Sequence, residues 1–178
     1  MLDGMPGHLP DLDYGDRNMT SEPQPKLEKA EWTAADFDAM GWHDNAVHAL
    51  AFEPALPHPG RLLVDLDYII EWVKPAPPDS AFKFWICPAT LVFDAASDLV
   101  VDADLTAQSF ELSLDAITRS EPDEHGIRTW SLAGHEFTAV VRAKGYRQHL
   151  RRRPVLSARQ RLTPEQRGGI AFGEQGFA

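Results

Sequence analysis

Residues 63–73 read Leu-Val-Asp-Leu-Asp-Tyr-Ile-Ile-Glu-Trp-Val, and this stretch decides the fold class. Its even-numbered positions are all apolar, whereas carboxylates occupy several of the odd-numbered positions. Successive residues of a β-strand point to opposite faces, so a period of two predicts a strand with one buried face. The other face of this strand is expected to carry Asp65, Asp67 and Glu71.

Similar alternation recurs along the chain and predicts about seven strands. They are expected at about residues 46–52, 63–73, 81–94, 99–102, 109–115, 127–132 and 136–143. The proline-rich loop at 74–80 is too short for a parallel crossover, so its flanking strands are expected to be antiparallel. Pro88 indicates a bulge or an edge position. With one or two short helices, starting at Thr33 and Thr163, the pattern predicts a mainly β fold: an antiparallel sheet forming a sandwich or partial barrel.

Charge is distributed unevenly along the 178 residues, whose formal net charge is −10. The net charge is −4 over residues 1–31, −13 over residues 32–141 and +7 over residues 142–178. The first of these segments also lacks apolar periodicity, so we expect it to be disordered and acidic. An antiparallel β domain is expected over residues 32–146. The basic C-terminal extension, residues 147–178, is expected to pack on that domain and to end loosely.

The sequence shows no feature that would place the protein in a membrane or outside the cell. The longest uninterrupted apolar runs, such as residues 49–52, have four residues, whereas a membrane-spanning helix needs about 20. The first residues resemble no signal peptide, and Met19 offers a second possible start. The single cysteine, Cys87, lies in an apolar run and predicts a buried thiol. We therefore expect a cytoplasmic protein with no membrane partner.

Asp65, Asp67 and Glu71 form a candidate acidic cluster. Alternate strand residues lie about 6–7 Å apart, so Asp65 and Asp67 can share a cation or a proton and divide acid and base roles. The alternative is a solvated face, or a face covered by basic side chains of the C-terminal extension. No phosphate-loop, dinucleotide-binding or hydrolase motif accompanies the carboxylates, so we expect no cofactor and favour a protein that is not an enzyme.

Arg147, Arg151, Arg152 and Arg153 form a candidate basic patch. Guanidinium groups bind phosphates through paired hydrogen bonds, which makes phosphate or RNA binding an open alternative. The acidic body would repel a nucleic-acid backbone, however, and Tyr146 is the only interleaved aromatic residue available for stacking on bases. Pairing of these arginines with the acidic strand faces is therefore the preferred interpretation.

Trp85 and Lys83 are the candidate interface residues. They alternate with Phe84 and Ile86. If the phenylalanine face is the core, Trp85 lies on the outer face of its strand, where an exposed tryptophan can contact a partner.

His43, Asp44 and His48 are weak candidate metal ligands. Imidazole and carboxylate groups both bind zinc and iron. The spacing along a single strand does not make the three side chains converge, so local hydrogen bonding is favoured and no metal site is predicted.

Several strings resemble those of a family of uncharacterised bacterial proteins, a domain of unknown function. They are Gly41-Trp42-His43-Asp44, Leu66-Asp67-Tyr68-Ile69-Ile70-Glu71-Trp72, Pro88-Ala89-Thr90-Leu91-Val92-Phe93, Arg152-Arg153-Pro154-Val155-Leu156 and Arg167-Gly168-Gly169. The resemblance would cover residues 41–169. It implies a bacterial protein but no activity and no catalytic residues.

The sequence therefore predicts a non-enzymatic binding or protein-interaction module. Its expected partner is another protein with a basic surface, by analogy of charge with immunity proteins and other inhibitors. Two alternatives stay open: an enzyme or cation-binding protein that uses Asp65, Asp67 and Glu71, and a phosphate or RNA binder that uses residues 147–153. A deep pocket lined by these carboxylates favours the first alternative, whereas a flat acidic face with Trp85 exposed favours the module.

Overall fold

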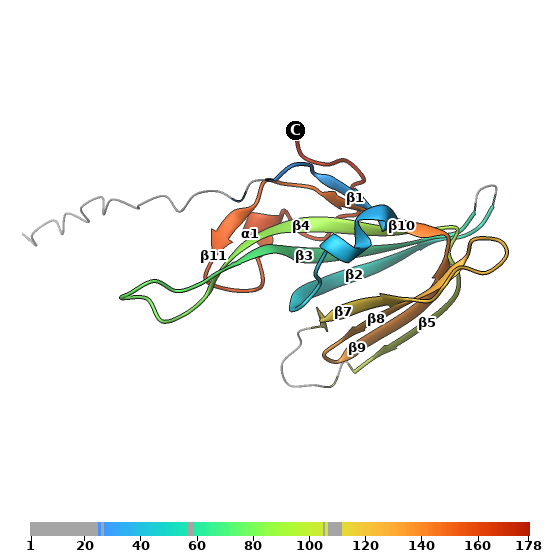
Figure 1. The fold of residues 1–178 in the computed structure, drawn as a ribbon, viewed down its shortest axis with the longest axis horizontal. Helices are drawn as coiled ribbons and strands as arrows, with labels where there is room; N and C mark the ends of the chain where they lie inside the picture. Colours follow the sequence, from blue (N-terminus) through green and yellow to red (C-terminus); the bar gives the residue numbers. More distant parts are fainter. Residues whose placement is uncertain (1–24, 26, 57–58, 105, 107–111) are drawn as a thin grey trace, which may run out of the picture.

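The computed structural model describes residues 25, 27–56, 59–104, 106 and 112–178, which form two antiparallel sheets and two short helices (Figure 1). The first sheet has the strand order β1-β10-β4-β3-β2-β6, and β11 also pairs with β4. Its strands are β1 (Glu31–Thr33), β2 (Asn45–Glu53), β3 (Arg61–Val73), β4 (Lys83–Asp94), β6 (Ser113–Leu114), β10 (Gly145–Leu150) and β11 (Val155–Ser157). The second sheet has the order β5-β9-β8-β7, with β5 (Ser97–Ala103), β7 (Ala116–Arg119), β8 (Arg128–Gly134) and β9 (Phe137–Ala143). The predicted mainly β fold, a sandwich or partial barrel of antiparallel sheets, is confirmed.

Both helices begin at the residues that the sequence indicates. The 3-10 helix η1 (Ala34–Ala39) starts after Thr33, and α1 (Pro164–Arg167) starts after Thr163, each with a complete capping box. A capping box satisfies free backbone N–H groups at a helix start. Gly168 ends α1 with a φ of 78°, a left-handed conformation that glycine adopts without steric cost.

The structure does not divide the chain at the two boundaries expected from the sequence, after residues 31 and 146. Residues 1–24 and 26 of the expected disordered segment lie outside the described residues, as do residues 109–111 of one expected strand. Within the described part, Leu27 packs against the core and β1 begins at Glu31. The expected boundary after residue 146 falls inside β10, which pairs with both β1 and β4. The basic extension therefore begins as an inner strand of the first sheet.

Strands β3 and β4 form the central hairpin of the first sheet and pair from Arg61 opposite Asp94 to Val73 opposite Lys83. Pro88 lies inside β4 rather than at an edge. On the side away from β3, β10 pairs with residues 89–94 and β11 with residues 84–86. Pro88 lies in the gap between these partners, and its carbonyl accepts from the Arg151 N–H at 2.9 Å. The N–H that proline lacks would face this same gap, so the ladder loses no hydrogen bond there.

The main core fills the space between the two sheets. The even-numbered residues of β3 from Leu62 to Ile70 supply its apolar face, as the sequence predicts. Trp72 does not, because it follows the register shift and packs against Phe84 on the opposite face. The second sheet contributes Trp130, Leu132 and Phe137, and all of these side chains are buried. Burial of each such large side chain contributes about 1.5–3 kcal/mol. The period-two repeat therefore identifies the inner face of the sandwich.

The opposite face of the first sheet is also covered. The C-terminal segment, residues 151–178, includes β11 and α1 and lies across β3 and β4 (Figure 1). A second apolar cluster, made of Ile69, Phe84, Ile86 and Leu162, joins this segment to the sheet. The molecule therefore has three layers, and alternation along β3 and β4 separates two buried environments rather than a core from solvent.

Candidate functional site

Asp65 projects toward the C-terminal segment and is completely buried. Arg151 donates to its Oδ1 at 2.6 Å, and Arg167 donates to Oδ1 at 2.7 Å and to Oδ2 at 3.1 Å. The Ala171 N–H also donates to Oδ2, at 3.1 Å. These charge-assisted hydrogen bonds satisfy both carboxylate oxygens, as a buried charge requires.

Asp67 lies two residues further along β3 and is equally buried. Its Oδ1 accepts from Arg167 at 3.1 Å, and its Oδ2 lies 2.8 Å from His48 Nε2 and accepts from the Leu162 N–H at 2.9 Å. Burial raises the pKa of this carboxyl, but the His48 hydrogen bond and charge, the Leu162 N–H and Arg167 together hold it below its usual range. Asp65 and Asp67 thus hold the C-terminal segment on the sheet.

Glu71 does not join these carboxylates. The pairing of β3 with β4 shifts register between Ile69 and Glu71, and Glu71 is exposed. The expected three-carboxylate cluster is therefore reduced to a buried pair, because a bulge interrupts the strict alternation on which it depended.

The four arginines of the expected basic patch contact different acceptors of this chain. Arg147 binds Asp94 through two hydrogen bonds of 2.9 Å, and Arg151 binds Asp65. Arg152 donates to backbone carbonyls of α1, and Arg153 donates to the Ala178 carbonyl. The guanidinium groups therefore bind within the molecule instead of forming one cationic surface.

Trp85 is buried, with 6% of its surface exposed, so the expectation of an outward-facing tryptophan is wrong. The expectation assumed that one face of β4 is solvated. In fact the C-terminal segment covers the face of Phe84 and Ile86. The other candidate interface residue, Lys83, is partly exposed and binds Asp79 at 2.9 Å.

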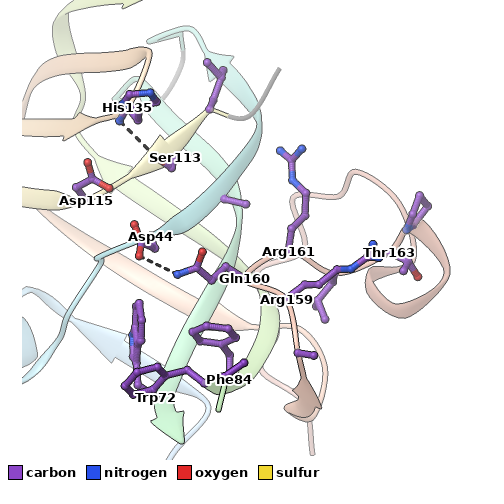
Figure 2. A pocket seen from close by; sticks show the side chains of 17 residues that line it. Asp44, Trp72, Phe84, Ser113, Asp115, His135, Arg159, Gln160, Arg161 and Thr163 are labelled. Atoms are coloured by element: carbon purple, nitrogen blue, oxygen red, sulfur yellow. Dashed lines mark hydrogen bonds between the residues drawn. The ribbon is translucent and has the colours of Figure 1, made fainter. Parts of the chain in front are cut away.

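A cleft of about 1030 Å³ opens between the first sheet and the C-terminal segment (Figure 2). One wall is aromatic and comes from the end of the β3–β4 hairpin, where Trp72 lies 4.9 Å from Phe84 and 5.9 Å from Phe82 between ring centroids. Trp72 and Phe82 are 40% and 43% exposed. Arg159 and other residues of the C-terminal segment form the opposite wall. The cleft thus offers an apolar surface that solvent can reach.

Asp44 and Asp115 line another part of the cleft, and Gln160 extends toward Asp44 from the C-terminal segment (Figure 2). Asp44 precedes β2, and Asp115 follows β6. Because Asn45 pairs with Leu114 at the end of the antiparallel ladder, Asp44 and Asp115 lie close together just beyond that end. Like charges directly opposite each other in a sheet are destabilising. Among the described residues, no lysine or arginine forms an ion pair with either carboxylate.

His43 completes a cluster with these two carboxylates. One potential ligand atom from each of His43, Asp44 and Asp115 lies within 4.8 Å of the others. His43 Nδ1 is 3.0 Å from Asp44 Oδ1, and the His43 ring lies 5.9 Å from the Trp72 ring. Gln160 donates to the other oxygen of Asp44 at 2.8 Å. The imidazole therefore connects the acidic part of the cleft to the aromatic wall.

The candidate metal ligands of the sequence are divided between two places. His43 and Asp44 lie together, whereas His48 binds Asp67 in the buried network. Asp115 replaces His48 as the third member of the cluster, and sequence reasoning missed it. The pairing register of β2 with β6 brings Asp115 to Asp44, and local sequence contains no signal for that register.

Comparison with known proteins gives no match to a protein-family model, a curated protein or a solved structure. The family resemblance described above therefore stays a prediction. In the part of the chain that the structure describes, no helix has both the length and the apolar character to cross a membrane.

Proposed function

We propose that this protein is a non-enzymatic interaction module whose cleft binds a basic side chain of a partner protein. One observation carries the proposal: Asp44 and Asp115 converge beside the aromatic wall, and neither forms an ion pair with a described lysine or arginine. A guanidinium or ammonium group placed between them would gain charge-assisted hydrogen bonds to both carboxylates. It would also relieve the repulsion between these two neighbouring carboxylates.

The aromatic wall supports the same class of ligand. Trp72 is exposed and lies next to His43, so a cation held at Asp44 and Asp115 would be close to the face or edge of an indole ring. Aromatic faces attract cations, and Trp does so most strongly. Phe82 and Phe84 extend the wall and offer a contact for an apolar neighbour of the basic residue.

The overall charge favours the approach of such a partner. Residues 32–141, which include both carboxylates and the aromatic wall, have a net charge of −13. An acidic surface accelerates association with a basic protein and selects against acidic competitors. Two alternatives have less support: acid–base catalysis at Asp65 and Asp67, and RNA binding by residues 147–153. The two carboxylates bind arginines of the same chain, and the arginines of residues 147–153 likewise bind acceptors within the chain.

A capped tetrapeptide, Ala-Arg-Phe-Ala, tests the chemistry directly. In nuclear magnetic resonance titrations we expect it to shift the signals of the Trp72 indole and of residues 43–45 and 115. The matched peptide carries citrulline, which keeps the shape of arginine without its charge. We expect its binding to be at least about tenfold weaker, because hydrogen bonds to charged groups contribute about 1.5–3 kcal/mol.

Dependence on the charges of Asp44 and Asp115 also identifies the natural partner. Partner proteins are captured from the host with tagged wild-type protein and, in parallel, with the double variant Asp44→Asn, Asp115→Asn. The control is Glu71→Gln, which replaces an exposed acidic residue. The proposal requires a protein that binds the wild type and the control with one affinity and the double variant at least about tenfold more weakly. Equal binding of both peptides, or a partner indifferent to Asp44 and Asp115, would contradict it.

A further inference from the structure

We infer that His43, Asp44 and Asp115 bind a divalent transition-metal ion of the zinc class, and that this ion competes with the basic side chain for the same carboxylates. The competition rests on the proposed function, whereas the metal site itself does not. The three residues offer one imidazole nitrogen and two carboxylate oxygens, which are standard ligands of Zn²⁺.

The distances suit a small metal ion. Ligand atoms of tetrahedral zinc lie about 3.3 Å apart, since each bond is about 2.0–2.1 Å long. The three candidate atoms already lie within 4.8 Å of one another, and the His43 and Asp44 atoms are 3.0 Å apart. The His43 side chain is 73% exposed, so little packing opposes its rotation. Closure around an ion requires side-chain rotation but no backbone rearrangement.

The backbone on both sides of the cluster is fixed. Asn45, which follows Asp44, is buried, and its Oδ1 accepts from the Ile69 N–H at 2.8 Å. The Asp115 N–H donates to the Ala133 carbonyl at 2.9 Å. Two anchored backbone segments thus hold the carboxylates opposite each other before any ion arrives, which lowers the entropic cost of binding.

A second-layer contact orients one of the ligands. The Gln160 amide occupies one oxygen of Asp44 and leaves the other toward His43. Hydrogen bonds of this kind fix ligating carboxylates, and their loss typically weakens metal binding by about 10- to 100-fold. Three protein ligands would also leave the fourth position of a tetrahedral ion for water or another ligand.

Isothermal titration of the chelator-treated full chain with ZnCl₂ tests the site. We expect one ion per chain, and at least about tenfold weaker binding for Asp115→Asn, for His43→Ala and for Gln160→Ala. His125→Ala is the matched control, because His125 is an exposed histidine 3.6 Å from a carboxylate outside the cleft. Circular dichroism verifies that each variant is folded.

Paramagnetic Mn²⁺ locates the ion independently. We expect it to broaden the amide signals of residues 43–45 and 115 before those around His125. Absence of saturable zinc binding up to about 1 mM, or equal binding by wild type and Asp115→Asn, would overturn the metal site. Loss of binding in His125→Ala would do the same.

The Ala-Arg-Phe-Ala peptide then tests the competition. Saturating zinc should weaken peptide binding in wild type by the factor that mass action predicts for one shared site. If the peptide binds equally well with and without zinc, the competition is wrong although the metal site stands. If the peptide never binds while zinc does, the proposed function fails and the metal site is retained.

Discussion

Arg167 donates to both carboxylate oxygens of Asp65, at 2.7 and 3.1 Å, although 102 residues separate them in the chain. Their side chains are 3% and 0% exposed. Arg167 also reaches Asp67 through its Nε, so a single guanidinium connects α1 to two positions of β3. This contact holds the C-terminal segment, and with it one wall of the cleft, on the first sheet.

Replacement of Arg167 by alanine should be strongly destabilising. It would leave two buried carboxylates without their shared partner, and breaking a buried ion pair from one side costs about 3–5 kcal/mol. Urea unfolding followed by tryptophan fluorescence measures the loss. Hydrogen exchange should also accelerate at the Leu162 and Ala171 amides, which donate to the same carboxylates.

Arg159→Ala is the matched control for that substitution. Arg159 belongs to the same segment and is exposed, and its side chain forms no ion pair with a described residue. We expect its effect to stay within about 0.5 kcal/mol. An Arg167→Ala variant as stable as this control would show that the buried network does not hold the segment.

Asp67 should make stability depend on pH at the acidic end. Its pKa in the folded protein is below the usual 3.8 that applies in the unfolded chain. A carboxyl of this kind stabilises the fold above its unfolded pKa, and the contribution is lost as the pH falls through the folded pKa. The stability difference between wild type and Asp67→Asn should shrink as the pH falls below about pH 4.

Urea titrations of the two proteins between pH 7 and pH 3 provide the measurement, with the exposed Glu71→Gln variant as the control expected to follow wild type. A difference that does not change with pH would contradict the role of the ionised Asp67.

Much of the fold is predictable because it depends on local periodicity. The even positions of β3 up to Ile70 face the sandwich core as the repeat predicts, and both helix starts follow their threonine caps. What the repeat does not reveal is a third layer. Carboxylates on alternate residues fit either a solvated or a covered face, and only the uneven charge along the chain favours the pairing with a C-terminal arginine that Arg151 makes with Asp65. The local repeat gives no sign that Arg167 binds both carboxylates.

Cys87 should be unreactive in the native state. Its side chain is completely buried in the core, and burial raises the pKa of the thiol far above its usual range. In the native protein, Ellman's reagent should therefore modify the Cys87 thiol only as fast as the protein opens. In urea, the thiol should react immediately. Rapid modification of the folded protein would show that the central hairpin is more dynamic than its packing indicates.

Gly134→Ala should destabilise the second sheet. A Cβ at this position would collide with the backbone of Ser113 and Leu114, which has no freedom to rotate away. Such overpacking typically costs about 1–3 kcal/mol. Gly41→Ala is the control, because nothing lies within 4 Å of its added Cβ. Thermal unfolding of both variants measures the contrast, and equal melting temperatures would contradict the close approach of β8 to β6.

The candidate site was only half predictable. His43 and Asp44 are adjacent in sequence, and a metal role for them could be considered from residue types alone. Asp115 is 71 positions beyond Asp44, and the two meet only because the ladder pairs Asn45 with Leu114. Register depends on which strands become neighbours, and that choice follows from the packing of both sheets rather than from any short motif.

Because the carboxylates of Asp44 and Asp115 repel each other, the effect of Asp115→Asn on stability should change sign when zinc binds. In the presence of a chelator, Asp115→Asn should raise stability by about 0.2–1 kcal/mol, because it removes a like charge close to Asp44. With saturating ZnCl₂, wild type should become the more stable protein, since an ion that binds only the folded state adds its binding free energy to stability. Urea unfolding under both conditions measures this reversal. If Asp115→Asn is less stable than wild type in the chelator, the two carboxylates do not repel each other, and the reason for a cation at this position is lost.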